Sequence, residues 1–241
     1  MTMISPVPVP DEFRQAADSF GIAFDDGDLD RLGQFLALLL DQTQRMNLTA
    51  IRDPDEAWIR HVFDSLTLLP LIHQFGADTV ADVGSGGGVP GIPLAICMPQ
   101  VQVTLIEATG KKADFLRSVS RDLELGNVTV VADRTETLAS YSGPLRNQFD
   151  VVTARAVGRL PVLLELTVPL ARIGGYVLAV KGQQAAQEVS ESRVALQHLR
   201  AEYVHTQETS TGQIVVIRKV GKTPKAYPRR PGEPKRAPLV D

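Results

Sequence analysis

Residues 80–91 read VADVGSGGGVPG, and this stretch decides the fold. The apolar, β-branched residues 79–83 are typical of a short buried strand. Four glycines then fall within five positions, and residues 92–96 open a helical run that tolerates Pro93 in its first turn. A glycine turn between a strand and a helix lets a ligand lie directly on the main chain at the carboxyl end of the strand.

Three kinds of nucleotide site compete for this turn. A P-loop requires Lys-Ser or Lys-Thr after its second glycine, but Ile-Pro stands there, which excludes it. A dinucleotide fingerprint can be drawn through Gly86, Gly88 and Gly91, although two prolines lie awkwardly in the helix that it should open. The third interpretation starts from Asp82, because an acid followed by Gly-x-Gly resembles the first motif of class I methyltransferases that use S-adenosylmethionine. A glycine turn without a ligand is the remaining alternative.

A carboxylate ends the next predicted strand. Residues 101–106 alternate and then turn apolar, and Glu107 follows 23 residues after Gly84. In dinucleotide-binding folds, an acid about 20 residues beyond the glycines accepts the ribose hydroxyls. We therefore expect Glu107 to hold a ribose, the alternative being a solvated strand end. A third predicted strand ends at residues 133–136, where side chains and main-chain groups could hold an adenine.

Length and composition are those of a globular α/β protein. The 241 residues, of which 44% are hydrophobic, allow one large domain or two small ones. Residues 1–10 lack the features of a signal peptide, and the longest aliphatic run, residues 35–40, is too short to span a bilayer. Cys97 is the single cysteine, which excludes an intrachain disulfide and fits a reducing compartment. We expect a cytoplasmic monomer that does not bind membranes.

Charge is distributed unevenly along the chain. Residues 218–241 carry eight Lys or Arg against two carboxylates, a net charge of +6, whereas the whole chain carries −3 and the remainder therefore −9. Such asymmetry indicates a basic tail that meets a polyanion. The cations of this tail, residues 221–241, could neutralise RNA phosphates, and Tyr227 could stack on an unpaired base. The alternative is a solvated, disordered end.

Residues 1–75 are predicted to form a helical extension. Apolar side chains recur at helical spacing over residues 29–39, and Asp53-Pro54 is typical of an N-cap followed by proline at the first helical position. We expect the proline-rich residues 1–10 to be disordered. The helix after Asp53 carries on one side Trp58, Val62, Leu66 and Leu69, and its polar residues are His61, Asp64 and Ser65. Without further information, His61 and Asp64 could be ordinary surface residues.

Strands and helices alternate from residue 79 onward, which indicates a parallel sheet with crossover helices. The predicted strands are residues 79–84, 101–107, 127–132, 149–154 and 175–181. The predicted helices are residues 92–98, 110–125, 161–171 and 183–199. Residues 201–209 and 213–220, joined by Ser-Thr-Gly, are predicted to form a hairpin. Seven strands with the last antiparallel are the Rossmann-like α/β arrangement of class I S-adenosylmethionine-dependent methyltransferases, here over residues 76–220.

Several segments together resemble one family, the bacterial small-subunit ribosomal RNA methyltransferase G, also called glucose-inhibited division protein B. They are NLTAIRDPDEAWIRHVFDSL (47–66), DVGSGGGVPGIPLAI (82–96), LIEATGKKADFL (105–116), FDVVTARAVGRL (149–160), LAVKG (178–182) and the basic end TPKAYPRRPGEPKRAPL (223–239). The resemblance implies a transferase that methylates N7 of one guanine in the decoding-region loop of 16S rRNA, with S-adenosylmethionine as methyl donor. The implied partner is 16S rRNA, the small ribosomal subunit or its precursor.

The same resemblance implies roles for individual residues, and no metal. The residues expected to bind the cofactor are Gly84, Gly86, Gly88, Val89, Glu107, Thr135, Glu136 and Arg155. Those expected at the target base are Asn47, His61, Asp64, Arg155 and Lys181. Gly84 and Val89 would border the methionine part, and Arg155 would lie beside the transferable methyl group. Many family members have Ala where Thr135 stands in this chain, a position expected to contact adenine through its main chain. Many also have Trp where Gln42 stands.

Motifs for other methylation chemistries are missing after the fourth predicted strand. Guanine N7 presents a free lone pair, so its methylation requires no general base. Methylation of an exocyclic amine would call for Asn/Asp-Pro-Pro-aromatic, but Thr-Ala-Arg-Ala stands at residues 153–156. Covalent attack on a pyrimidine needs a nucleophilic cysteine, and Cys97 is badly placed for that role. What remains is catalysis by alignment, in which orientation supplies about 7–11 kcal/mol. Asp64 could stabilise the cationic product.

Two other functions stay open. The chain could be a methyltransferase for another RNA, a small molecule or a protein, although the basic tail argues against the last two. It could also be a nucleotide-binding RNA chaperone without enzymatic activity, which would bind the cofactor and leave rRNA unmethylated.

Overall fold

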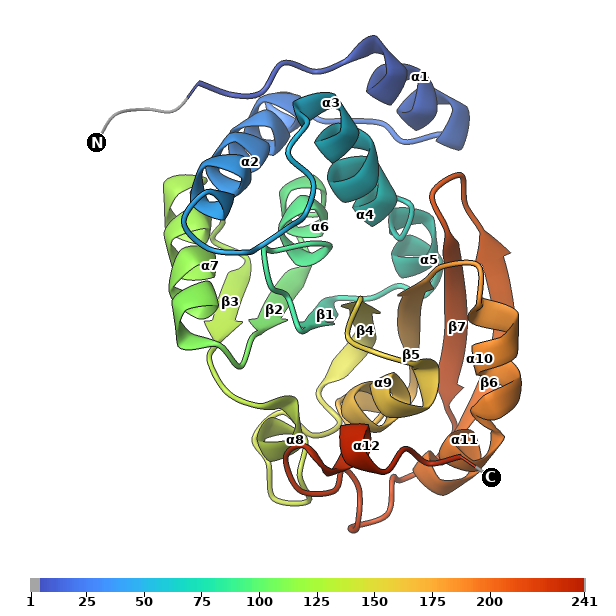
Figure 1. The fold of residues 1–241 in the computed structure, drawn as a ribbon. Helices are drawn as coiled ribbons and strands as arrows, with labels where there is room; N and C mark the ends of the chain where they lie inside the picture. Colours follow the sequence, from blue (N-terminus) through green and yellow to red (C-terminus); the bar gives the residue numbers. More distant parts are fainter. Residues whose placement is uncertain (1–4, 241) are drawn as a thin grey trace.

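Seven strands form one sheet in the computed structural model, which describes residues 5–240 (Figure 1). The strands are β1 (Thr79–Val83), β2 (Gln102–Ile106), β3 (Val128–Val131), β4 (Phe149–Arg155), β5 (Ala171–Lys181), β6 (Ala201–Glu208) and β7 (Gln213–Lys219). Their order is β3-β2-β1-β4-β5-β7-β6; β1 to β5 are parallel, and β7 is antiparallel to both of its neighbours. The predicted fold class is confirmed. The order reverses between β1 and β4, which opens a crevice at their carboxyl ends.

Helices cover both faces of the sheet. The helical segments are α1 (Asp11–Phe20), α2 (Asp28–Thr43), α3 (Pro54–Ala57), the π-helix η1 (Trp58–Phe63), α4 (Asp64–Leu66), α5 (Leu69–Gln74), α6 (Gly91–Cys97), α7 (Gly110–Asp122), α8 (Thr135–Leu138), α9 (Leu160–Thr167), α10 (Ala185–Glu191), α11 (Arg193–Leu199) and α12 (Glu233–Arg236). Segments α1 to α7 pack on one face and α8 to α12 on the other (Figure 1).

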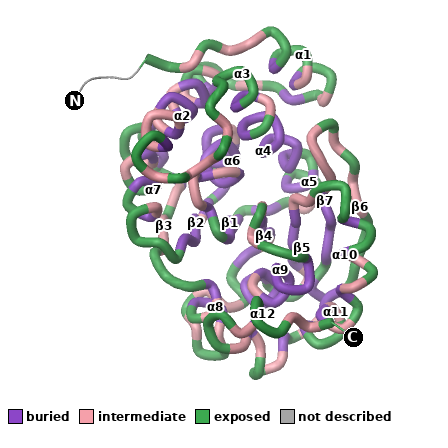
Figure 2. The backbone as a smooth tube through the Cα atoms, viewed as in Figure 1, coloured by how far each residue is buried: buried purple, intermediate pink, exposed green. Residues whose placement is uncertain are grey.

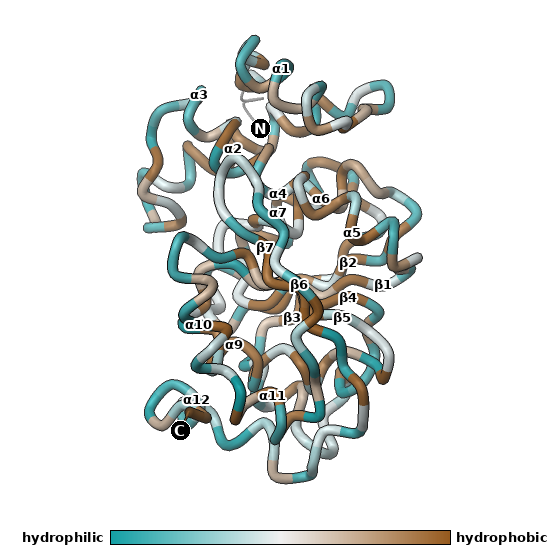
Figure 3. The backbone as a smooth tube through the Cα atoms, turned by 90° about the vertical axis from the view of Figure 1, so that its right-hand side faces the viewer, coloured by the Kyte–Doolittle hydropathy of each residue, from teal (hydrophilic) through white to brown (hydrophobic). Residues whose placement is uncertain are grey.

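Successive side chains along each strand point to opposite faces of the sheet and belong to two separate hydrophobic cores. Val80 of β1 and Val151 of β4 face the N-terminal helices, whereas Ala81 and Val152, one residue later, face α9 and α11. A parallel sheet covered on both faces needs such apolar residues on both sides. Buried residues accordingly concentrate in the strands (Figure 2), and hydrophobic residues run through the centre between the helical layers (Figure 3).

Order in the N-terminal extension begins before Asp11, earlier than predicted. Residues 5–10 were expected to be disordered, but the Val7 N–H donates to the Gly33 carbonyl at 3.1 Å, and Val7 and Val9 pack on the core. A Cβ at Gly33 would lie 2.6 Å from the Val7 carbonyl oxygen, so this glycine permits the close approach. The prediction is wrong for these residues; residues 1–4 of that segment lie outside the described residues.

The cap at Asp53 is confirmed, since its carboxylate accepts the Glu56 N–H at 2.8 Å. The chain then passes through η1 into α4. The four apolar residues predicted on one side, Trp58, Val62, Leu66 and Leu69, are buried. His61 and Asp64 are buried too, with exposed fractions of 7% and 5%, so they are not surface residues. A π-helical turn within an α-helix is often found at functional sites.

Two helix ends differ from the prediction. The helix predicted over residues 183–199 is two helices, α10 and α11, with the buried Ser192 between them; its hydroxyl donates to the Glu188 carbonyl and its N–H to the Val189 carbonyl. The helix predicted over residues 161–171 ends at Thr167, and β5 begins already at Ala171. Within residues 5–240, no helix has the length and apolar character needed to cross a bilayer.

The C-terminal strap, residues 223–237, lies along the α9 and α11 side of the sheet (Figure 1). Two of the eight cations counted in residues 218–241 are held by the protein: Lys219 is fully buried, and the half-buried Arg229 pairs with the fully buried Glu165 at 2.6 Å. Tyr227 packs on the core beside α11, and its hydroxyl lies 2.6 Å from His198 Nδ1. The ring is half-buried and lines a small cavity with His198, and its stacking on an RNA base stays a prediction.

Candidate functional site

The glycine turn after β1 faces a cavity on one side and the core on the other. Gly84, Gly86 and Gly88 have φ angles of +72°, +52° and +91°, which favour glycine. Gly84 is exposed, and its N–H donates to the Ile106 carbonyl at 2.9 Å. Gly88 instead faces the core, since a Cβ there would meet the side chain of Ile92 at 2.8 Å. Gly88 therefore shapes the turn and does not line the cavity, which differs from its predicted contact with the cofactor.

Asp82 holds the turn from beneath. Its side chain is 1% exposed; Oδ2 accepts the Gly91 N–H at 3.2 Å, and Oδ1 accepts the Thr153 hydroxyl at 3.4 Å. Burial raises the pKa of this carboxyl to about 6. Asp82 therefore positions the start of α6 and does not face a ligand.

Two cavities meet at Gly84. The turn cavity, of about 290 Å³, is lined by Leu39, Leu48, Thr49, His61, Gly84, Ser85, Gly86, Gly87, Val89, Arg155 and Ala156. The Glu107 cavity, of about 210 Å³, is lined by Val83, Gly84, Ile106, Glu107, Ala108, Arg134, Thr135, Glu136, Val157, Val162, Leu166, Pro234 and Lys235. Seven of the predicted cofactor residues, all except Gly88, line one or both of these cavities.

Glu107 links the end of β2 to the glycine turn. Its Oε2 accepts the Gly86 N–H at 2.9 Å and its Oε1 accepts the Thr109 N–H at 2.7 Å, while 7% of the residue stays exposed. An ionised carboxylate offers about four lone-pair positions, so both oxygens can still accept a hydroxyl. Glu136, which lines the same cavity, accepts the Gly232 N–H of the C-terminal strap at 2.9 Å.

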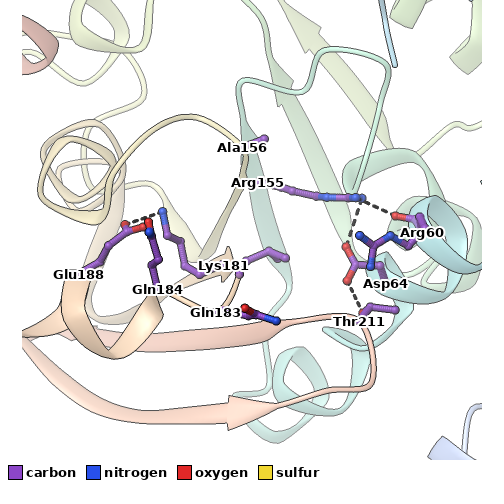
Figure 4. A pocket seen from close by; sticks show the side chains of 11 residues that line it. Arg60, Asp64, Arg155, Ala156, Lys181, Gln183, Gln184, Glu188 and Thr211 are labelled. Atoms are coloured by element: carbon purple, nitrogen blue, oxygen red, sulfur yellow. Dashed lines mark hydrogen bonds and ion pairs between the residues drawn. The ribbon is translucent and has the colours of Figure 1, made fainter. Parts of the chain in front are cut away.

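A third, polar cavity of about 450 Å³ lies beyond Arg155 (Figure 4). It is lined by Arg60, Asp64, Arg155, Ala156, Val180, Lys181, Gly182, Gln183, Gln184, Glu188 and Thr211. Arg155 and Ala156 also line the turn cavity, so this pair separates the two spaces. Ala156 has a φ of +56°, which is uncommon for a residue with a Cβ and turns the chain sharply after β4.

Arg155 extends from the end of β4 to the helical extension. Its Nη1 lies 3.2 Å from Asp64 Oδ2, and its Nη2 donates to the Arg60 carbonyl at 2.7 Å. The other oxygen of Asp64 accepts the hydroxyl of Thr211, from the β6–β7 loop, at 2.5 Å (Figure 4). Burial lowers the pKa of Arg155, and the Asp64 carboxylate opposes that shift. Three distant parts of the chain thus meet at one ion pair.

Lys181 occupies the opposite wall of the polar cavity. Its Nζ lies 2.7 Å from Glu188 Oε2 and donates to the Gly158 carbonyl at 2.8 Å. Glu188 also accepts the Leu160 N–H at 2.6 Å. The cavity therefore presents paired charges on both walls, a chemistry suited to a polar ligand.

His61, predicted at the target base, lines the turn cavity together with Arg155 and does not line the polar cavity. Its Nε2 lies 2.7 Å from the Thr49 hydroxyl. Burial and the neighbouring Arg155 lower the pKa of His61 to about 4, so the ring is neutral at pH 7. Asn47 is exposed and lies outside the lining of all three cavities, because the loop turns Leu48 and Thr49 inward in its place.

Sequence reasoning missed several residues of the polar cavity. Arg60 lies one residue before the predicted His61, and Thr211 lies at the tip of the predicted hairpin. Glu188 lies on α10, where its pairing with Lys181 gives no periodic signal. A polar residue at a hairpin tip was the one available hint, and it does not say which segment the tip will meet.

A family model described as rRNA small subunit methyltransferase G matches residues 28–217. The chain belongs to this family. It is 50% identical to the ribosomal RNA small subunit methyltransferase G of Sorangium cellulosum, over 93% of this chain and 94% of that protein. It is 40% identical to the protein of the same name from Limosilactobacillus fermentum, over 96% and 99% of the two chains. The predicted family is thus confirmed.

Solved structures with little sequence identity share the fold of this family member. An O-methyltransferase from Bacillus cereus, in complex with SAH, covers 85% of this chain and 96% of its own, with a TM-score of 0.53 at 19% identity. A methyltransferase from Geobacter sulfurreducens covers 88% and 100%, with a TM-score of 0.54 at 14% identity. These likenesses bear on the fold alone.

Proposed function

We propose that the chain transfers a methyl group from S-adenosylmethionine to N7 of a guanine in 16S rRNA. Membership of the rRNA small subunit methyltransferase G family supports this proposal. The observation that carries it is the meeting of two cavities at Gly84, one of which, the turn cavity, shares Arg155 with a separate polar cavity. A methyl donor and an acceptor base need such adjoining spaces.

The residues around Gly84 fit an adenosyl cofactor. The two cavities together offer about 500 Å³, within the usual range for small-molecule sites. A Cβ at Gly84 would lie 3.0 Å from Val157 Cγ2 and would fill the passage between them. Glu107 supplies a carboxylate for a pair of ribose hydroxyls, and the turn cavity supplies main chain and Val89 for the methionine part. When bound, S-adenosylmethionine supplies an electrophilic methyl group.

The polar cavity fits a guanine. Beside N7, guanine presents its O6 acceptor, which an arginine or a lysine can recognise while the N7 lone pair stays free to accept the methyl group. Arg155, Arg60 and Lys181 bring such donors to this cavity. Adenine would present an amino group beside N7, and these cations have no acceptor for its hydrogen bond.

Catalysis rests on alignment and charge. N7 carries no proton, so no residue has to act as a base, and the neutral His61 bonded to Thr49 fits a wall residue. Arg155, fixed by Asp64 and the Arg60 carbonyl, would orient the base toward the turn cavity. The methylated base is a cation, and the Asp64 carboxylate would stabilise that charge as it develops.

The test is a transfer assay with tritiated S-adenosylmethionine. Deproteinised 16S rRNA, intact small subunits and a metabolite extract serve as acceptors, and the labelled RNA is digested to nucleosides. We expect label in N7-methylguanine from one or both RNA samples and none with Glu107→Ala. Label confined to the metabolite extract would favour the small-molecule alternative, and cofactor binding without any labelled product would favour the chaperone. The form of the rRNA substrate, the monomeric state and the cytoplasmic location stay predictions.

A further inference from the structure

The C-terminal strap reaches the Glu107 cavity. Pro234, which is buried, and Lys235 belong to its lining, together with Glu107, Thr135 and Glu136. These two residues lie on α12, which packs on α9 (Figure 1). Nearly 100 residues separate Glu136 from Gly232, so this wall is assembled from segments that lie far apart in the sequence.

Three anchors hold the strap in place. Arg146 donates to the carbonyls of Thr223 at 2.7 Å and Tyr227 at 2.8 Å. Further along, Nη2 of Arg229 lies 2.6 Å from Glu165 Oε2, and its N–H and Nε donate to Glu165 Oε1 at 2.8 and 2.9 Å. The same guanidinium donates to the Ala237 carbonyl at 2.8 Å, beyond α12. Arg229 therefore ties both ends of α12 to one carboxylate of α9.

Burial of Glu165 makes the Arg229 anchor costly to break. Its carboxylate is fully buried, and Arg229 is the cation that contacts it. Loss of one partner from a buried ion pair leaves the other charge without compensation. Detachment of the strap would leave the Glu165 carboxylate buried and unpaired, which carries a large free-energy cost. The third anchor, the Gly232 N–H bound to the Glu136 carboxylate at 2.9 Å, holds the strap to the cavity wall itself.

We propose that the C-terminal strap is a wall of the adenosine site, held in position by the Arg229–Glu165 ion pair. The inference rests on the proposed function, since it assigns the adenosine part of the methyl donor to the Glu107 cavity. The strap then contributes to affinity for the methyl donor, in addition to any contact that its exposed cations make with rRNA. Arg229 is a positioning residue, because it acts through Pro234 and Lys235 and does not itself line the cavity.

Calorimetry with S-adenosylhomocysteine on the full chain tests the proposal. Arg229→Ala should raise Kd about fivefold or more, because the wall is no longer fixed before binding. Arg229→Lys should restore part of the affinity, and the exposed neighbour Arg230→Ala, the matched control, should stay within about twofold of wild type. In turnover, Arg229→Ala should raise KM for the methyl donor far more than it lowers kcat. Unchanged affinity in Arg229→Ala would overturn the proposal.

A second measurement covers the case in which Arg229→Ala does not fold. In the wild-type chain, S-adenosylhomocysteine should slow hydrogen exchange of the amides in residues 229–236, together with those of residues 84–88. Protection of residues 84–88 alone would overturn the role of the strap. Glu107→Ala distinguishes failure of the strap proposal from failure of the proposed function. If Glu107→Ala weakens binding of S-adenosylhomocysteine and Arg229→Ala does not, only the strap proposal fails. If binding is unchanged in Glu107→Ala, the proposed function fails as well.

Discussion

Glu107→Ala is the substitution with the largest effect that the site predicts on cofactor binding. The carboxylate accepts the N–H groups of Gly86 and Thr109 and faces the cavity proposed for the adenosine. Each hydrogen bond to a charged group contributes about 1.5–3 kcal/mol, so loss of two ribose hydrogen bonds should cost about 3–6 kcal/mol. This corresponds to an increase in Kd of about 10²- to 10⁴-fold. Two backbone donors also lose their acceptor, which should lower the unfolding free energy by about 1–3 kcal/mol.

The assay is calorimetric titration with S-adenosylhomocysteine, at a temperature well below the unfolding midpoint of the variant. Glu107→Gln keeps one carbonyl acceptor and should lie between wild type and Glu107→Ala. Asp114→Asn, on the exposed side of α7, is the control for removal of a carboxylate and should bind as wild type does. Binding by Glu107→Ala within about threefold of wild type would refute the assignment of the ribose to this carboxylate.

Three further predictions concern Asp82, Asp64 and the exposed cations of the basic tail. Burial raises the pKa of Asp82 to about 6, so its ionisation destabilises the fold as pH rises from about 4 to about 6, whereas His61, with its pKa lowered to about 4, has the opposite effect up to about pH 6.5. Asp82→Asn removes the Asp82 contribution and leaves those of all other groups, so between about pH 4 and 6 the slope of its unfolding free energy against pH should be more positive than that of wild type; parallel profiles from urea denaturation would contradict the shift. Asp64→Asn should lower kcat about tenfold or more in single-turnover methylation, and unchanged turnover would remove its proposed role. The exposed cations of the tail are Lys222, Lys225, Arg230, Lys235 and Arg236. Their replacement by Gln should make the slope of log K for rRNA binding against log salt concentration shallower by about 0.7 for each phosphate that is no longer neutralised. An unchanged slope would leave the tail without a role in RNA binding.

The central sheet could be predicted because its signals are local. Apolar runs, glycine turns and the Asp53 cap each depend on a few neighbouring residues, and all seven strands were found within four residues of their ends. The cofactor side of the site could also be predicted, since Gly84 and Glu107 follow directly from strand ends that share one edge of the sheet.

Contacts between distant segments could not be predicted in this way. Thr211 reaches Asp64 across 147 positions, and Arg229 reaches Glu165 across 64, with no sequence pattern that marks either pair. Charge counting likewise treated Lys219 and Arg229 as free cations, because composition does not reveal which charges are buried. The loop at Asn47 shows the same limit, since the direction of a side chain in an irregular segment depends on its packing partners.

The most direct test of the account is the map of N7-methylguanine in 16S rRNA from cells that lack this chain. Borohydride reduction followed by aniline cleavage, or mass spectrometry of digested rRNA, locates the modified base. The account predicts that one N7-methylguanine in the decoding-region loop disappears, returns with the wild-type gene and does not return with Glu107→Ala. An unchanged level of this base in cells without the chain would contradict the proposed activity.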